Sequence, residues 1–195
     1  MKNSKDTKKY IIEKVAPVFN KKGFTGTYLS DLEKATGLTK GSIYGNFKNK
    51  NEVALEAFRH NYKQLSKKIK LRMEQSKTSK EKIGQFIEFY EDEYENIIHN
   101  GGCPILNTAV DADDGNESLK TAVQKAIINW IELIEDILTE GVANNEFKNI
   151  DTYKFSVKII SIIEGSIMLA KALDDKNIIQ HNLENLKAEI NNISK

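Results

Sequence analysis

Cysteine, proline and long apolar runs are all scarce in this 195-residue chain, and each scarcity excludes a class of structure. The single cysteine, Cys103, excludes an internal disulfide framework and suits a reducing compartment. No apolar run approaches the ~18 residues of a membrane span, and the lysine-rich N-terminus lacks the apolar core of a signal peptide. With only two prolines and 39% apolar residues, the composition predicts a soluble, cytoplasmic, all-α protein.

Catalytic and metal-binding patterns are also missing. The three histidines, at positions 60, 99 and 181, have no acidic or cysteine partner at metal-ligand spacing, and there is no nucleophile elbow. The stretch from Gly37 to Gly41 comes nearest to a phosphate-binding loop, but its spacing is one residue short and Ser42 stands where the lysine belongs. We therefore expect no catalytic residue, no metal site and no cofactor, and we predict that the protein is not an enzyme.

The net charge of +1 hides a strong asymmetry along the chain. Residues 1–72 hold 17 Lys and Arg against 6 Asp and Glu, a net charge of +11, whereas residues 73–195 hold 12 against 22, a net charge of −10. A lysine-rich stretch is commonly no more than a solvated helix face. The alternative is a polyanionic partner such as DNA, because lysines beside phosphates release condensed counterions on binding.

Residues 23–50 carry the pattern of two short helices joined by a tight turn. Thr27 is placed to cap a first helix over residues 28–36, and Asp31 lies near the positive end of that helix. Gly37 then supplies the left-handed backbone that ends a helix without a Cβ penalty. Three apolar residues recur at helical spacing and form one face of the first helix: Leu29, Leu32 and Ala35.

Thr39 is the next capping residue, and it opens the second short helix. Ile43 and Phe47 point inward at an i, i+4 interval. Gly41 and Gly45 each cost roughly 1 kcal/mol of helix stability relative to alanine, so a sequence selected for stability alone is not expected to keep both. Glycine at these positions permits close approach to a bulky partner.

Two short helices joined by such a turn are typical of a helix-turn-helix, whose second helix enters the major groove of DNA. Phosphate contacts set the register on the duplex, and base contacts select its sequence. The predicted phosphate contacts are Thr27, Thr39, Lys40, Tyr44, Asn46, Lys48 and Lys50. The predicted base contacts are Lys40, Gly41, Ser42 and Tyr44. For Tyr44 the alternative is partial burial under the neighbouring helices.

A wider set of residues around this motif matches a known family pattern. It comprises Gly23-Phe24, Thr27, Asp31-Leu32, Ala35, the run from Gly37 to Tyr44, Phe47, Lys50 and Glu52. In these residues the chain resembles the N-terminal domain of TetR-type transcriptional regulators. The family usually has alanine where Glu33 stands, so we expect Glu33 to face solvent or to pair locally. The resemblance implies a DNA-binding domain over residues 1–50 and a helical ligand-binding and dimerisation domain over residues 51–195.

Helical spacing also predicts the remaining elements. A supporting helix over residues 6–22 contains Pro17, which removes an amide donor and clashes with the carbonyl of Glu13, so we expect a bend or a break there. Asn49 and Glu52 resemble a capping box that opens a helix over residues 50–74. Further helices are expected at 80–99, 118–143, 152–173 and 176–193. A short apolar piece is expected at 103–110, and a mobile acidic loop at 111–117.

The helix predicted over residues 152–173 has an apolar surface wider than one neighbouring helix can cover. In the resembled family the last two helices pair with their counterparts, so we expect homodimerisation through the segment from Thr152 to Ile193. Burial of this helix inside a single chain is the alternative.

A ligand pocket is a further implication of the resemblance. The residues expected to contact a small, partly apolar effector are Phe86, Phe89, Tyr90, Tyr94, Asn107, Trp130 and Met168. At helical spacing such side chains more often fill a core. The segment from Gly101 to Asn107 also resembles a motif found in a subset of these regulators, and Cys103 within it is either a packing residue or a redox sensor.

Two functions stay open at this point. The first is a DNA-binding repressor that is released from a palindromic operator by a small-molecule effector. The second is a helix-turn-helix protein whose C-terminal domain recruits a protein partner without an effector.

Overall fold

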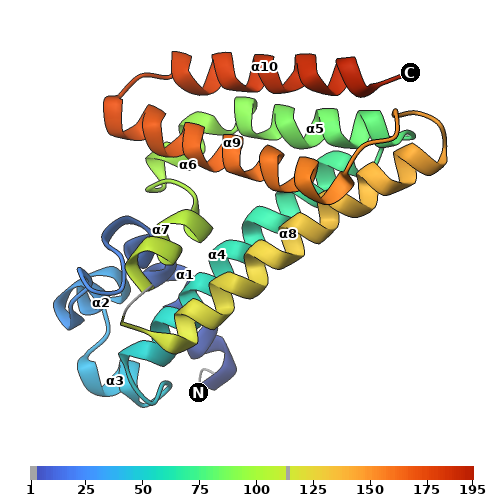
Figure 1. Ribbon diagram of the computed structural model, residues 1–195. Helices are drawn as coiled ribbons and strands as arrows, with labels where there is room; N and C mark the ends of the chain where they lie inside the picture. Colours follow the sequence, from blue (N-terminus) through green and yellow to red (C-terminus); the bar gives the residue numbers. More distant parts are fainter. Residues whose placement is uncertain (1–3, 113–114) are drawn as a thin grey trace. The chain divides into compact units, whose positions relative to one another are not determined.

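The computed structural model describes residues 4–112 and 115–195, and these residues form helices joined by short connections (Figure 1). The helices are α1 (Ser4–Lys22), α2 (Leu29–Thr36), α3 (Lys40–Tyr44), α4 (Lys50–Met73), α5 (Ser79–Asp92), α6 (Tyr94–His99), α7 (Pro104–Ala112), α8 (Glu117–Ala143), α9 (Thr152–Leu173) and α10 (Asn177–Ile193). Over the described residues the only β-type pairing is an isolated bridge between Phe147 and Ser194. The predicted all-α class is confirmed.

The chain divides into two compact units. The head unit comprises Met1–Leu65 and Asn100–Ala126, and the C-terminal unit comprises Ser66–His99 and Ile127–Lys195. The chain therefore passes from one unit to the other within α4, after His99 and within α8. None of the helices in the described part combines the length and the apolarity that crossing a bilayer requires.

The core of the head unit forms where α1 packs on α2 and α2 meets α3. The side chains buried there come from all three helices and from the start of α4: Ile11, Val15, Ala16, Phe19, Leu32, Ile43, Phe47, Val53, Ala57 and Phe58. Their burial holds the short helices α2 and α3, which are below the length at which an isolated helix is stable in water. Tertiary packing therefore fixes the orientation of α3.

The predicted interruption at Pro17 is wrong, because α1 runs unbroken from Ser4 to Lys22 through the proline. Both Pro17 and Glu13 are exposed residues, so the carbonyl that loses its amide partner belongs to the solvent side of the helix and not to the core. On the buried side of the helix, the side-chain amide of Asn61 donates to the carbonyl of Ala16 at 2.9 Å. Packing and this hydrogen bond hold the helix across the proline.

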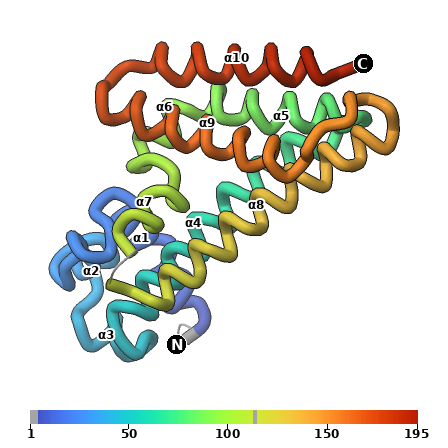
Figure 2. Tube along the Cα trace, in the orientation of Figure 1, coloured from blue at the N-terminus to red at the C-terminus, as the bar shows by residue number. Residues whose placement is uncertain are grey.

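In the C-terminal unit α9 packs along α10, and α10 packs against α5 (Figure 2). The single helix predicted over residues 80–99 is wrong, because α5 ends at Asp92 and α6 begins at Tyr94. Glu93 between them leaves the helical region (φ −89°, ψ 2°), and its carboxylate pairs with Lys68 at 2.6 Å. No glycine or proline marks this break, so helical periodicity could not reveal it.

The mobile loop predicted over residues 111–117 is also corrected at both ends. Asp111 and Ala112 belong to α7, and Glu117 begins α8. The middle of that prediction falls on residues 113–114, which lie outside the described residues. The other long helices begin and end within about two residues of their predicted bounds.

Candidate nucleic-acid interface

The first helix of the motif, α2, begins one residue later than predicted. The cap is Tyr28, whose N–H donates to the carboxylate of Asp31 at 2.9 Å. Thr27 is not the cap: it is fully buried, and its hydroxyl donates to the carbonyl of Gly23 at 2.6 Å. Lys22 also pairs with Asp31 at 2.6 Å. The hydrogen bond from Lys22, together with the Tyr28 amide, lowers the pKa of Asp31.

The turn between α2 and α3 is fixed by its backbone and by α1. Gly37 has φ of 69°, a left-handed conformation that favours glycine, and its N–H donates to the carbonyl of Glu33 at 2.8 Å. The hydroxyl of Thr36 accepts from the N–H of Leu38 at 3.2 Å. The hydroxyl of Tyr10 on α1 donates to the carbonyl of Thr36 at 2.9 Å. These bonds define how the chain enters α3.

Both ends of α3 are held by side chains. At its start the hydroxyl of Thr39 accepts from the N–H of Ser42 at 3.3 Å, which confirms Thr39 as the cap. The carboxylate of Glu33 on α2 accepts from the N–H of Lys40 at 2.8 Å, so Glu33 pairs locally and ties the two helices together. At its end the amide of Asn46 donates to the carbonyl of Ser42 at 2.9 Å.

One face of α3 is buried and the other is open. Ile43 and Phe47 are 0% and 3% exposed, as their spacing predicted. The exposed residues between positions 39 and 48 are Thr39, Lys40, Gly41, Ser42, Gly45 and Lys48, whereas Tyr44 and Asn46 are half-buried. A Cβ added at Gly41 would meet no atom closer than the Thr39 hydroxyl at 4.0 Å. The protein's own packing therefore does not require glycine at this position.

The start of α4 carries a dense set of charges. The side chain of Asn49 accepts from the N–H of Glu52 at 3.0 Å, which caps α4. The carboxylate of Glu52 accepts from the N–H of Lys48 at 2.7 Å and pairs with Lys8 at 2.9 Å. These contacts, the Lys48 amide first, lower the pKa of Glu52. The backbone that presents the Lys48 side chain is thus firmly held.

Lys50 is a less accessible cation than the sequence suggested. It is half-buried, and its Nζ lies 4.4 Å from the centroid of the Phe24 ring. Burial lowers the pKa of Lys50, and the charge of Asp111 opposes that shift. Among the lysines predicted to contact phosphates, Lys40 and Lys48 are exposed and Lys50 is half-buried.

Four of the predicted effector contacts form a buried aromatic cluster in the C-terminal unit: Phe86, Phe89, Tyr90 and Trp130. Phe86 lies edge-on to Tyr90 and Trp130, with ring centroids 5.4 and 6.4 Å apart. Tyr90 lies 5.2 Å from Phe89 and 6.2 Å from Trp130, again edge-on. The rings therefore pack on one another.

The remaining three predicted effector contacts lie elsewhere. Tyr94 is buried in α6 beside Lys176, and burial raises its pKa. Met168 is 49% exposed on α9, so it does not join the buried aromatic cluster as expected. Asn107 belongs to the head unit, where its amide donates to the carbonyl of Gly101 at 2.8 Å.

Sequence reasoning missed Asp111 and Asn20, whose side chains bond to backbone groups beside the helix-turn-helix. Asp111 accepts from the amide of Phe24, 87 residues earlier in the chain. No local spacing rule can find such a pair. The available signal was the glycine at position 23, which has φ of 72° and lies against Asp111.

The residues that the structure describes contain no group of three or more His, Cys, Asp or Glu side chains placed to hold a metal ion. They do contain two short helices joined by a left-handed glycine, with the second helix capped at both ends and exposed along one face. That geometry defines the helix-turn-helix class of DNA-binding proteins.

Comparison with known families agrees with this geometry. Residues 11–57 match the family described as bacterial regulatory proteins, tetR family, and residues 79–186 match the tetracyclin repressor-like C-terminal domain. The chain belongs to the TetR family of transcriptional regulators. The predicted family is confirmed, and the family is one of DNA-binding regulators of the repressor type rather than of enzymes.

Several similar proteins cover nearly the whole chain. A TetR family transcriptional regulator from Cytophaga hutchinsonii is 35% identical, with 100% of this chain and 98% of that chain covered and a TM-score of 0.91. A TetR regulator from Chloroflexus aurantiacus is 31% identical over the same shares, with a TM-score of 0.93. An uncharacterized HTH-type regulator from Bacillus subtilis, YxaF, is 28% identical over 172 residues, 88% of each chain.

Proposed function

We propose that the protein is a homodimeric repressor that binds a pseudo-palindromic DNA operator through α3 and is released by a small, partly apolar effector. One observation carries this proposal: α3 is held rigidly at both ends and exposes a surface with hydrogen-bonding side chains and a glycine that internal packing does not require. A surface of that kind suits insertion into a major groove. Such a regulator acts on DNA, so we infer a cytoplasmic location.

The proposed contacts follow the exposure of each side chain. Lys40, Lys48 and Thr39 are placed for phosphates, with the half-buried Asn46 and Lys50 at the margin of the surface. Gly41, Ser42 and Tyr44 are proposed to meet base edges. We leave Thr27 out of the contact set, because its buried hydroxyl already donates to the carbonyl of Gly23.

The proposed dimer surface is an exposed apolar face of α9. Met168, Leu169 and Leu173 are 49%, 43% and 66% exposed. Gly165 precedes them by about one helical turn, and a Cβ added there would meet no atom within 4 Å. Ser166 points the other way, where its hydroxyl accepts from the amide of Asn182 on α10 at 2.9 Å. We infer that a second copy of the chain covers this face.

The switch follows from the geometry of a two-fold dimer on DNA. Its two recognition helices have to reach successive major grooves about 34 Å apart, so an effector that changes their separation weakens the DNA complex. To move the protein from mostly bound to mostly free, the effector has to prefer the released conformation by several kcal/mol.

The aromatic cluster is the proposed effector site. Because Phe86, Tyr90 and Trp130 contact one another, an effector that binds among them has to separate their rings. Trp130 is the only tryptophan of the chain, so its fluorescence reports this event directly. An effector that changes the Trp130 emission and also lowers DNA affinity favours the switch over the recruitment of a protein partner.

Selection of bound fragments from a random oligonucleotide pool tests the proposal. We expect enrichment of a two-fold symmetric sequence. When apolar small molecules are then screened against the complex of the protein with the selected duplex, we expect at least one of them to release the protein from the DNA. Enrichment without any effector response would leave DNA binding in place and favour the protein-partner alternative. No enrichment at all would contradict the proposed function.

Two substitutions on the interface separate its phosphate contacts from its base contacts. Lys48→Ala is expected to weaken selected and random DNA alike and to reduce the slope of log affinity against log salt by about 1. Ser42→Ala is expected to leave that slope unchanged and to alter the preferred base at one position of each half-site. Titrations at several salt concentrations and a repeated selection measure both, and a uniform loss for Ser42→Ala would contradict base contact.

A further inference from the structure

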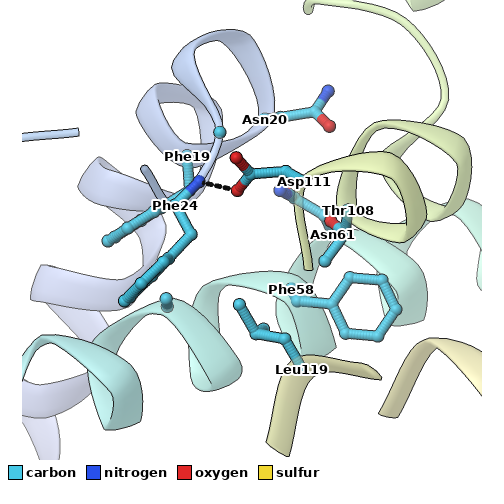
Figure 3. A pocket seen from close by; sticks show the side chains of 10 residues that line it. Phe19, Asn20, Phe24, Phe58, Asn61, Thr108, Asp111 and Leu119 are labelled. Carbon is cyan, nitrogen blue, oxygen red and sulfur yellow. Dashed lines mark hydrogen bonds between the residues drawn. The ribbon is translucent and has the colours of Figure 1, made fainter. Parts of the chain in front are cut away.

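A carboxylate from α7 holds the turn that leads into the helix-turn-helix. Asp111 accepts a hydrogen bond from the N–H of Phe24 (Figure 3). Both of its oxygens also lie 3.4 Å from the amide nitrogen of Thr25. Phe24 and Thr25 belong to the turn between α1 and α2. Charge-assisted bonds from a carboxylate to backbone amides are among the stronger hydrogen bonds in proteins.

A second group of hydrogen bonds joins the same segments one helical turn away. The amide of Asn20 on α1 donates to the carbonyls of Asn100 and Gly102, at 2.7 and 3.0 Å. In return, the amide of Asn107 on α7 donates to the backbone carbonyl of Asn20 at 3.0 Å. The two asparagines therefore join α1 to the segment that leads into α7 and to α7 itself.

Glycines allow the close approach at both points. Gly23 has φ of 72°, and a Cβ there would lie 2.9 Å from the Asp111 carboxyl carbon. Gly101 has φ of 101°, and a Cβ there would lie 2.8 Å from a side-chain carbon of Lys21. Glycine is favoured at both positions for two reasons: the backbone has a positive φ, and there is no space for a Cβ atom.

Polar and apolar side chains meet where these segments join. A cavity of about 20 Å³ remains beside Asp111, between the turn, α4, α7 and the start of α8. Its lining mixes apolar and polar side chains, among them Phe58, Leu119, Asn61 and Thr108 (Figure 3). That volume holds about one water molecule. The Asp111 carboxylate therefore bonds to the backbone of the turn at a place where the surrounding side chains leave a small cavity.

We propose that Asp111 is a positioning residue for DNA binding: it clamps the turn before α2 and so fixes the orientation in which α3 is presented. The inference rests on the proposed function. The turn leads directly into α2, and the Glu33 carboxylate joins α2 to the first amide of α3. The clamping segment is covalently joined to the C-terminal unit at both ends, after His99 and within α8. Displacement of α7 would therefore break the Asp111 bond and free the turn before α2.

Substitution of Asp111 tests the proposed role, because the expected change in DNA affinity is opposite to the one that loss of a negative charge normally causes. Removal of a negative charge from a protein that binds DNA normally strengthens binding. Asp111→Ala is instead expected to weaken binding to the selected duplex on the order of tenfold, because only a fraction of heads keeps the competent orientation. Asp111→Asn, which keeps one acceptor oxygen, is expected to fall between. Asp136→Ala, which removes an exposed carboxylate from α8, is the charge-matched control and should bind as tightly as wild type or more tightly.

Two further measurements, made at a suitable temperature, distinguish positioning from lost stability. The salt slope should stay at the wild-type value, because no phosphate contact is removed. The comparison is made well below the melting temperature of each variant, so that only folded protein is titrated. Hydrogen exchange should speed up at the amides of Phe24 and Thr25, whereas the amide of Ile43, which bonds to Thr39 within the motif, stays protected.

Equal affinities for Asp111→Ala and Asp136→Ala would overturn the proposal, and so would wild-type exchange at Phe24 and Thr25 in the Asp111 variants. If the wild-type protein itself selects no DNA, the proposed function fails, and the exchange measurement still decides whether the clamp exists. Should Asp111→Ala fail to fold, Asp111→Asn carries the same comparison.

Discussion

Leu169→Glu on α9 is expected to convert the dimer into monomers and to weaken operator binding at least a hundredfold. Leu169 is 43% exposed on the apolar face around Gly165, so the single chain tolerates a carboxylate there. In the dimer the same carboxylate would be buried against apolar side chains, which is strongly unfavourable for an unpaired charge. Two half-sites are then bound by two independent heads, and the gain from joint binding is lost.

Light scattering after gel filtration measures the mass, and titration of the selected duplex measures the affinity. Ile128→Glu is the matched control, because Ile128 is an apolar residue of α8 with 51% exposure and lies outside the α9 face. It adds the same charge and should leave the mass unchanged and the affinity within a few-fold of wild type. A Leu169→Glu protein that remains a dimer at micromolar concentration would place the dimer surface elsewhere.

Local signals in the sequence were sufficient for most of the helix-turn-helix. The cap at Thr39, the left-handed Gly37 and the inward pair Ile43 and Phe47 all follow from residues within four positions of one another. These features depend on backbone propensity and helical spacing, which a single sequence carries. The exposed face of α3 follows from them directly, since its inward face is fixed.

Features set by distant residues could not be predicted in the same way. Thr27 looked like a cap, but its hydroxyl bonds back to Gly23 and Tyr28 takes that place. The helix continues through Pro17 because packing and the hydrogen bond from Asn61 to Ala16 hold it. Asp111 lies 87 residues from the amide it binds. In each case tertiary contacts outweighed a local preference.

In the C-terminal unit, the sequence likewise could not predict which side chains of α9 face the core. The wide apolar surface of α9 was visible in the sequence, but helical spacing alone did not separate its two faces. Met168 is exposed although it was expected among the aromatic rings, whereas Ile163 and Ile167 are among the buried residues of this helix. Which stripe of an all-round apolar helix faces the core depends on where α10 packs, and that is a tertiary property.

Gly41→Leu is expected to weaken operator binding by about two orders of magnitude while the protein becomes no less stable to heat. Glycine costs a helix up to about 1 kcal/mol relative to alanine, and a leucine is nearly as good a helix former as alanine. Gly41 is exposed, and the nearest atom to an added Cβ would be the Thr39 hydroxyl at 4.0 Å, so we expect the larger side chain to extend into solvent. The loss of affinity comes only from the duplex, which can no longer approach the backbone.

The graded series Gly41→Ala and Gly41→Leu sharpens this argument, because stability and affinity should move in opposite directions. Gly84→Ala on α5 is the control: a Cβ there also meets no atom within 4 Å, so it should raise the melting temperature without changing DNA affinity. Each 1.4 kcal/mol of lost binding appears as a tenfold change in the dissociation constant. If Gly41→Leu binds the operator as wild type does, then the exposed side of α3 does not enter the groove at Gly41, and the register of the recognition helix has to be revised.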